Sequence, residues 1–267
     1  LMENPSSVAR HGWRGSWSGF GLAAVASVGV SVWVWTLLFP WLGYGTATRV
    51  VAHLSFFAAA LLLAWALRIA PRGFGLGPRH LGWAVAVGAV AYAAVMAGAA
   101  VGNAAFGLDV AVLRTRYDPV AFVDNWLLTA LGEELLFAGV VFVAAVRALP
   151  RHRRGWAVPL VAWTFAAMHL PGYLAIGYPV GSIVGRLALN AVSWSVFGTI
   201  YLLSGNLWLV VVAHAATDYG VTPLITNEPA FGLAFMATLV VGAWWQGRRG
   251  RGAPNHHHGD GAPARGG

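Results

Sequence analysis

The chain has 267 residues, of which 58% are hydrophobic and 10% are charged, and it contains no cysteine. Ordinary soluble domains carry about 25% charged residues, so this composition excludes a soluble domain, a disordered chain and a nucleic-acid module. The missing cysteine excludes disulfides, thiolate metal sites and a cysteine nucleophile. The net charge of +8 comes from arginines clustered between apolar runs. That arrangement is typical of topology determinants at a lipid bilayer, and we expect no nucleic-acid partner.

Long apolar runs follow one another along most of the chain. A helix needs roughly 20 apolar residues to cross the hydrocarbon core, and eight runs meet this length or approach it. They predict an all-α, polytopic membrane protein with about eight transmembrane helices, at residues 19–42, 48–69, 81–106, 120–149, 156–176, 182–203, 207–223 and 230–245. We therefore expect one membrane-embedded domain over residues 19–245, a cytoplasmic segment at 1–18 and a disordered cytoplasmic tail at 246–267.

The arginines predict how these spans are oriented. If the N-terminus is cytoplasmic and there are eight spans, thirteen of the seventeen arginines fall on the cytoplasmic side. Arginine is enriched in cytoplasmic loops, so the distribution favours a multi-pass protein of the plasma membrane with both termini in the cytoplasm. The outer side then carries only Arg49, Arg114, Arg116 and Arg186.

Five of the ionisable side chains in the predicted spans are of particular note, because insertion of a charge at mid-membrane costs at least about 2.5 to 3.5 kcal/mol. Glu133 and Glu134 are in the fourth span, His169 is in the fifth, and His214 and Asp218 are in the seventh. At a rise of about 1.5 Å per residue, all of them can lie at one level of the membrane. His214 and Asp218, four residues apart, share a helix face. Glu133 and Glu134 point about 100° apart, so one can face a cavity while the other braces the helix.

A carboxylate and two imidazoles in a low-dielectric cavity suit hydrolysis. The carboxylate would take a proton from water, one histidine would hold that water, and a second polar pair would stabilise the oxyanion. In the alternative, Glu133, His169 and His214 would hold a divalent metal ion such as zinc, whose bound water is the nucleophile. The residues alone leave both mechanisms open.

The same residues resemble the motifs of the CPBP family of intramembrane proteases, also called Abi proteins, which are related to the type II CAAX prenyl endopeptidases. The family pattern is Glu-Glu-x-x-x-Arg, Phe-x-x-x-His and His-x-x-x-Asn or Asp, on three separate membrane helices. Here the motifs stand as Glu133-Glu134, Phe165 to His169, and His214 to Asp218. The resemblance implies an eight-helix intramembrane endopeptidase, glutamate-dependent or metallo-, that cleaves membrane-associated peptide or protein substrates.

Carried over by position, the resemblance assigns a role to each site residue. Glu133 would be the general base and His169 would help to position the water, with Phe165 one turn before it. His214 and Asp218 would form the oxyanion site. Family members are commonly labelled metalloproteases, whereas the related prenyl endopeptidase has been argued to work through glutamate without metal ligation. We favour the glutamate mechanism.

One position departs from the family pattern. The family arginine falls at residue 138, which is Ala138 here, so Glu134 lacks its usual partner one turn along the helix. A buried carboxylate without a partner is costly, and we expect Arg186 to replace the missing arginine. Ala138 also keeps an alternative open, in which the chain is a non-catalytic membrane factor of the same fold, for self-immunity or as a scaffold. A transporter that uses the buried carboxylates as a relay is a third possibility.

Overall fold

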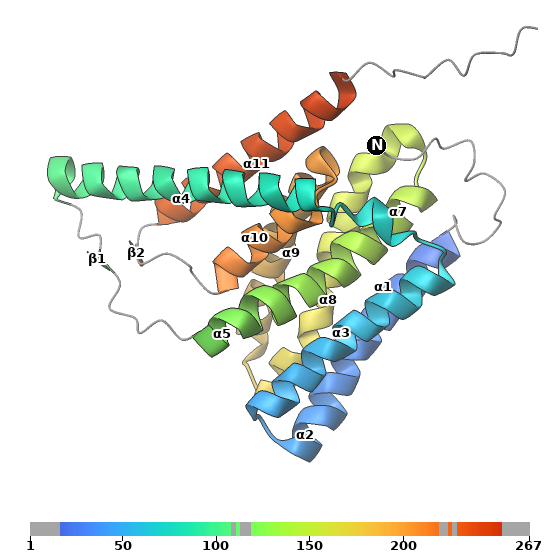
Figure 1. Ribbon diagram of the computed structural model, residues 1–267. Coiled ribbons are helices and arrows are strands. Elements are labelled where there is room, and N and C mark those ends of the chain that lie inside the picture. Colours follow the sequence, from blue (N-terminus) through green and yellow to red (C-terminus); the bar gives the residue numbers. More distant parts are fainter. Residues whose placement is uncertain (1–16, 108–110, 113–118, 219–223, 226–228, 253–267) are drawn as a thin grey trace, which may run out of the picture.

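The computed structural model describes residues 17–107, 111–112, 119–218, 224–225 and 229–252 (Figure 1). These residues are almost entirely helical. Within them, six helices are long and apolar enough to cross a membrane, which confirms an all-α polytopic membrane protein. The two strands described are short, β1 (Ala111–Val112) and β2 (Leu224–Ile225), and they pair in antiparallel register.

The first three predicted spans are found as long helices. The first is continuous from Trp17 to Leu42 and is formed by α1 (Trp17–Trp33), the π-helical η2 (Val34–Leu38) and α2 (Phe39–Leu42). The next elements are α3 (Thr46–Ala66), the short 3₁₀ helix η3 (Pro71–Phe74) and α4 (Pro78–Phe106). Large apolar side chains cover their outer faces, as expected of surfaces that contact lipid. Trp41 and Trp65, for example, are 88% and 81% exposed.

The fourth span lies at the centre of the molecule. It is formed by α5 (Pro119–Val123), η4 (Asp124–Ala130), α6 (Leu131–Glu134), η5 (Leu135–Val141) and α7 (Phe142–Ala148). In its most apolar stretch 72% of the residues are buried inside the protein, against 22–33% in the other five spans. Both η4 and η5 are π-helical, and they flank the Glu133-Glu134 pair. π-helical turns inside α-helices are frequent at functional sites.

The remaining helices pack around this central one. They are preceded by the 3₁₀ helix η6 (Arg151–Trp156) and are α8 (Ala157–Ile176), α9 (Val180–Ser204), α10 (Leu207–Asp218) and α11 (Pro229–Gly252). The helices α8 and α9 pack against each other extensively. They form a hairpin because α8 ends at Gly177, whose φ of +79° is a left-handed conformation that glycine adopts without strain.

Two predicted boundaries in the C-terminal part differ from the structure. The helix α11 continues to Gly252, so the chain beyond Trp245 begins as helix and not as the disordered tail that the composition predicts from residue 246. The helix α10 has 12 residues and is shorter than a full span, which needs roughly 20. Residues 219–223 of the predicted seventh span, residues 253–267 of the predicted tail and residues 1–16 lie outside the described part. The count of eight spans therefore stays a prediction.

A tight junction fixes the start of α10. Gly75 has φ of +72°, and a Cβ atom at this position would lie 2.0 Å from the carbonyl oxygen of Gly205. Next to it, the fully buried Asn206 donates from Nδ2 to the His80 carbonyl oxygen at 2.9 Å and to Gln246 Oε1 at 3.1 Å. The beginning of α10 is thus joined to the chain before α4 and to α11. This junction holds the helix that carries His214.

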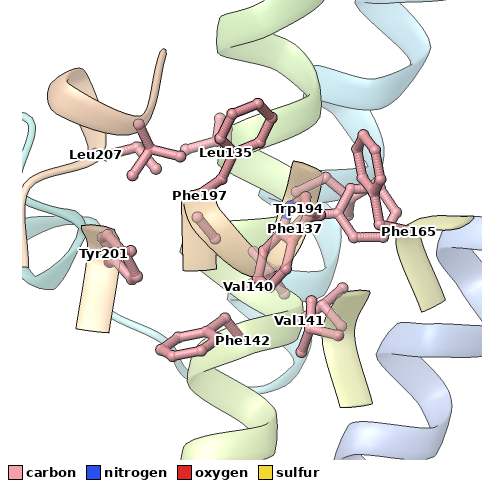
Figure 2. Close-up of a cluster of buried hydrophobic side chains, with 14 of the residues drawn as sticks. Leu135, Phe137, Val140, Val141, Phe142, Phe165, Trp194, Phe197, Tyr201 and Leu207 are labelled. Carbon is pink, nitrogen blue, oxygen red and sulfur yellow. The ribbon is translucent and has the colours of Figure 1, made fainter. Parts of the chain in front are cut away.

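Aromatic side chains form a buried core around the central helix (Figure 2). Phe137 and Phe142 come from this helix, Phe165 from α8, and Trp194 and Phe197 from α9, and each of these side chains is at most 4% exposed. The Phe137 and Phe165 rings pack edge to face, with centroids 5.0 Å apart. Such packing excludes water on one side of the Glu133-Glu134 pair, which gives the polar residues a low-dielectric environment.

Candidate active site

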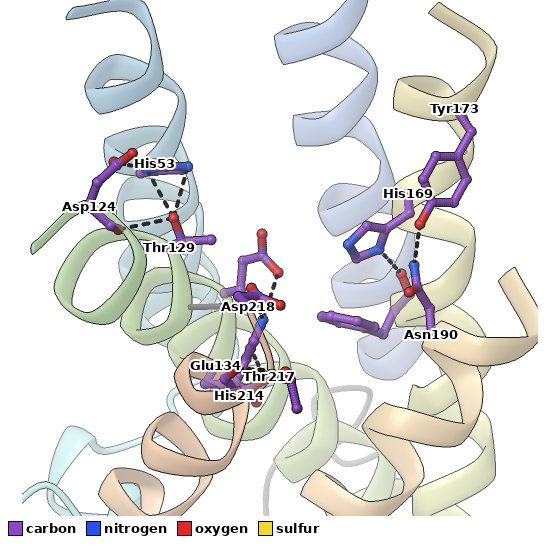
Figure 3. A network of polar contacts seen from close by, with 12 residues as sticks. His53, Asp124, Thr129, Glu134, His169, Tyr173, Asn190, His214, Thr217 and Asp218 are labelled. Atoms are coloured by element: carbon purple, nitrogen blue, oxygen red, sulfur yellow. Dashed lines mark hydrogen bonds and ion pairs between the residues drawn. The ribbon is translucent and has the colours of Figure 1, made fainter. Parts of the chain in front are cut away.

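The imidazole of His214 is the centre of a polar cluster that joins α10 to the central helix (Figure 3). Its Nδ1 lies 2.7 Å from Oε1 of Glu134, and its Nε2 lies 3.0 Å from Oδ2 of Asp218. The same Nε2 is 3.9 Å from Oε2 of Glu133. His214 and Asp218 meet because residues four apart on a helix share a face. Three carboxyl groups therefore surround one imidazole.

The hydrogen bonds define the state of this ring. An ionised carboxylate can only accept a hydrogen bond, so with Glu134 and Asp218 ionised both ring nitrogens of His214 must donate. The ring is then an imidazolium. Two aromatic rings suit this cation: Phe197 stacks on it at a centroid distance of 5.3 Å and an interplanar angle of 19°, and Phe165 packs edge-on at 5.9 Å. Aromatic faces attract cations, so packing and charge favour the same arrangement.

Exposure distinguishes the three carboxyl groups. The side chain of Asp218 is 39% exposed, that of Glu133 is 12% exposed and that of Glu134 is fully buried. Glu134 is also committed to His214 through a short hydrogen bond. Glu133 and Asp218 are therefore the carboxyl groups that a water molecule can reach, while Glu134 orients the imidazole.

His169 lies beside this cluster on α8. Its Nδ1 donates to the carbonyl oxygen of Phe165 at 2.9 Å, which leaves Nε2 as an acceptor. The Phe165 ring packs on His169, with centroids 4.7 Å apart, and also reaches His214. His169 is close enough for electrostatic interaction with His214 and Asp218. In Figure 3 its ring extends from α8 toward the side on which Asp218 lies.

The structure thus places the predicted site residues in two groups. Direct contacts join Glu133, Glu134, His214 and Asp218. Phe165 connects them to His169, for which the described contacts include no hydrogen bond to the other four. The two glutamates have different surroundings, as expected, because Glu133 is 12% exposed and Glu134 is fully buried. That one faces a cavity while the other braces the helix stays a prediction.

The predicted metal ligands are Glu133, His169 and His214. In the part of the chain that the structure describes, no group of three His, Asp or Glu side chains is arranged to hold a metal ion. The reason lies in the donor set, because both nitrogens of His214 already bond to carboxylates and neither is free to coordinate. These residues do not fit a metal ion as they are arranged here.

The prediction that Arg186 replaces the missing arginine is wrong. Its guanidinium carbon lies 4.2 Å from the centroid of the Tyr178 ring and 5.9 Å from that of Tyr173, at an exposed position near the start of α9. Oε1 of Glu134 bonds to His214, and Oε2 has no hydrogen-bond partner among the described residues. On α9, Trp194 rather than Arg186 lies near Glu134, and it is eight residues farther, or about 12 Å along the helix.

Sequence reasoning also missed a second polar group near the other end of the central helix (Figure 3). The buried Asp124 contacts Nδ1 of His53 at 3.1 Å and Nη1 of Arg49 at 3.6 Å, and Thr129 lies against His53. The signal in the sequence is an acidic residue inside a predicted span, the same signal that identifies Glu133. This network joins α3 to the central helix, and so does Gly132, where a Cβ would lie 3.0 Å from the Phe57 ring.

Comparison with known proteins gives one match. Residues 115–220 match the family model described as Rce1-like, type II CAAX prenyl endopeptidase. No curated protein and no solved structure matches the chain. The matched region contains all of the predicted catalytic residues, and it supports a protease role in this membrane protein. The match over residues 115–220 confirms the resemblance to the CPBP and CAAX protease family.

Proposed function

We propose that this protein is an intramembrane endopeptidase in which Glu133 activates water for attack on a peptide bond of a membrane-associated substrate. The observation that carries the proposal is the convergence of Glu133, Glu134 and Asp218 on the imidazole of His214, in the region that matches an endopeptidase family. Hydrolysis needs a base for water and a donor for the oxyanion, and this cluster contains both.

Glu133 is the base because water can reach its carboxylate and because no short ionic contact with the described residues holds it. Its side chain is 12% exposed, and its nearest described ionic partner, Nε2 of His214, is 3.9 Å away. A water molecule between Glu133 and Nε2 of His169 would give one proton to the carboxylate and attack the substrate carbonyl carbon with its oxygen. Glu134 cannot serve, because it is fully buried and its Oε1 holds His214.

The attack converts the carbonyl oxygen into an oxyanion, which needs a donor. The Nε2–H of His214 supplies it, and Asp218, which holds this N–H at 3.0 Å in the free protein, yields it to the oxyanion. The imidazolium suits a negative charge that forms in a site shielded from water. Glu134 holds the ring in place through Nδ1.

The intermediate collapses when the carbon–nitrogen bond breaks. Glu133 returns the proton that it took from water to the leaving amine, so the products are a carboxylic acid and an amine and the base is regenerated. No step requires a metal ion. Glu133 thus acts first as a general base and then as a general acid, a pair of roles that one positioned carboxyl group can fill.

We place the protein in the plasma membrane with both termini in the cytoplasm, because thirteen of the seventeen arginines then lie on the cytoplasmic side. The site is built from side chains in three helices that a lipid bilayer surrounds. Substrates are therefore peptides or proteins that are themselves anchored in the membrane. The family description names prenylated substrates, but the cluster around His214 recognises the peptide bond and contains no feature that requires a prenyl group.

The test is cleavage by purified protein in lipid vesicles. A membrane-anchored peptide library is incubated with the parent protein, and new termini are identified by mass spectrometry. We expect new termini with the parent and none with the double variant Glu133→Gln/His169→Gln. Ala138 favours the alternative of a non-catalytic factor. If the parent produces no new termini while its cellular effect survives the double variant, that alternative is correct.

A further inference from the structure

Two buried polar atoms beside the site lack a hydrogen bond of good geometry, Oε2 of Glu134 and Nε1 of Trp194. Both side chains are 0% exposed, so bulk water does not satisfy them. An unsatisfied buried polar group costs about 1 to 3 kcal/mol, and a charged one costs more. Two such groups in one core therefore require an explanation.

The two groups face each other. The side chains of Glu134 and Trp194 interact, and the indole N–H is the only hydrogen-bond donor that a tryptophan side chain has. The interaction therefore directs the N–H at the carboxylate. Since Oε1 of Glu134 is taken by His214, Oε2 is the atom that remains for the indole. We expect a small rotation of either side chain to complete the hydrogen bond.

The indole is held in this place by its neighbours. A Cβ atom at Gly198 would lie 2.5 Å from the Trp194 ring, so the glycine one turn along α9 provides the space in which the ring lies. Phe142 packs on the ring at a centroid distance of 6.0 Å, and Phe165 packs on it at 6.4 Å (Figure 2). A donor fixed in this way loses little side-chain entropy when it bonds to Glu134.

The position of Ala138 connects Trp194 to the departure from the family pattern. Glu134, Ala138 and Phe142 are spaced by four along the central helix, so they follow one face. Trp194 interacts with Glu134 and packs against Phe142, the residues four positions before and four positions after Ala138. Ala138 is fully buried, and we expect an arginine side chain there to compete with the indole for space.

From these contacts we infer that Trp194 is a positioning residue that replaces the missing arginine: its N–H fixes Glu134, and Glu134 in turn holds the imidazole of His214. Its effect on turnover rests on the proposed function, whereas its contact with Glu134 does not. Trp194 touches neither substrate nor water in this scheme. It acts by keeping the Nε2–H of His214 in the orientation that stabilises the oxyanion.

The kinetic test uses Trp194→Phe, which keeps an aromatic ring and removes the N–H. A hydrogen bond to a charged group contributes enough that its loss corresponds to a fall of about tenfold or more in kcat. We expect that fall with KM unchanged. Trp83→Phe is the matched control, because Nε1 of Trp83 is also buried without a partner but lies on α4, away from the site. The control should keep the parent kcat.

A rescue variant separates positioning from packing. In Trp194→Ala/Ala138→Arg, the removed indole leaves room for the family arginine, whose guanidinium can reach Glu134. We expect kcat of this double variant to exceed that of Trp194→Ala alone by about tenfold. If Glu133→Gln abolishes cleavage while Trp194→Phe keeps the parent kcat and arginine at 138 rescues nothing, this inference is wrong and the proposed function stands.

A second readout needs no catalysis. In a double-mutant cycle of thermal midpoints, Trp194→Phe should lower the midpoint by about 2 to 4 °C in the parent. In the Glu134→Gln background the same change should have less than half of that effect, because the charged acceptor is gone. Additive shifts would overturn the contact between Trp194 and Glu134 even if the protein cleaves no peptide.

Discussion

Glu134 and Asp218 bind opposite nitrogens of the same imidazole, but one is fully buried and the other is 39% exposed. The Nδ1 bond of His214 to Glu134 is 2.7 Å long and links the central helix to α10, while the Nε2 bond to Asp218 stays within α10. Both contacts have hydrogen-bond lengths. Because the Glu134 contact is buried and the Asp218 contact is partly exposed, we expect the Glu134 contact to contribute more to the stability of the fold.

The first prediction concerns stability. Removing one partner from a buried ion pair costs about 3 to 5 kcal/mol, whereas an exposed pair contributes about 0 to 1 kcal/mol. Glu134→Ala should therefore lower the thermal midpoint in detergent far more than Asp218→Ala does. Similar shifts for the two variants would show that the His214–Glu134 contact is not the buried link described here.

The second prediction concerns the acceptor on Nε2. In Asp218→Asn, the amide oxygen of the introduced asparagine can still accept from His214, and the family pattern permits Asn at this place. We expect Asp218→Asn to keep kcat within about tenfold of the parent, while Asp218→Leu falls further, because leucine offers no acceptor to orient and charge the imidazole before the substrate binds. The measurement is the initial rate in vesicles at saturating substrate. Equal rates for both variants would remove Asp218 from the oxyanion site.

The third prediction concerns the junction that positions α10. Gly75→Ala places a Cβ 2.0 Å from the carbonyl oxygen of Gly205 and forces alanine to φ of +72°. Left-handed backbone strain alone costs about 1 to 3 kcal/mol for a residue other than glycine, so the thermal midpoint should fall. Gly73→Ala is the control, since a Cβ there has no atom within 4 Å. An unchanged midpoint for Gly75→Ala would contradict the packing of this junction.

The fourth prediction concerns metal ions. Both nitrogens of His214 are hydrogen-bonded to carboxylates, so we expect cleavage to survive dialysis against a strong chelator. The protein should be truncated before His256, so that the three consecutive tail histidines contribute nothing to the effect of metal or chelator. Activity that disappears on chelation and returns with zinc would show that Glu133, His169 and His214 rearrange around a metal ion.

Some features can be predicted from the sequence alone, namely those that depend on helix periodicity or on the free-energy cost of placing a charge in a membrane. Six of the eight predicted spans are long apolar helices in the structure. Polar groups at one depth of the membrane predict a site shared by Glu133, His169, His214 and Asp218. The contacts of Glu133 and Asp218 with His214 agree with this prediction, whereas His169 is connected to His214 through the Phe165 ring. The spacing of four residues on a single helix is also enough to predict the His214–Asp218 contact.

Partners on different helices cannot be predicted in the same way. Charge alone points to Arg186, but the rotation and depth of α9 place Arg186 against Tyr178 and bring Trp194 near Glu134. The periodicity of a sequence does not determine how two packed helices are rotated relative to each other. The end of α11 at Gly252 is missed because composition alone does not exclude helix in a Gly- and Arg-rich segment.

The single-turnover rate of Glu133→Gln in lipid vesicles, compared with that of the parent protein, tests directly whether Glu133 is the general base. Glutamine keeps the shape of the side chain and removes the base, and a positioned general base contributes about 10² to 10⁴ to a rate. We expect the single-turnover rate to fall within that range, with substrate affinity and thermal midpoint unchanged. A rate equal to that of the parent would show that Glu133 is not the general base.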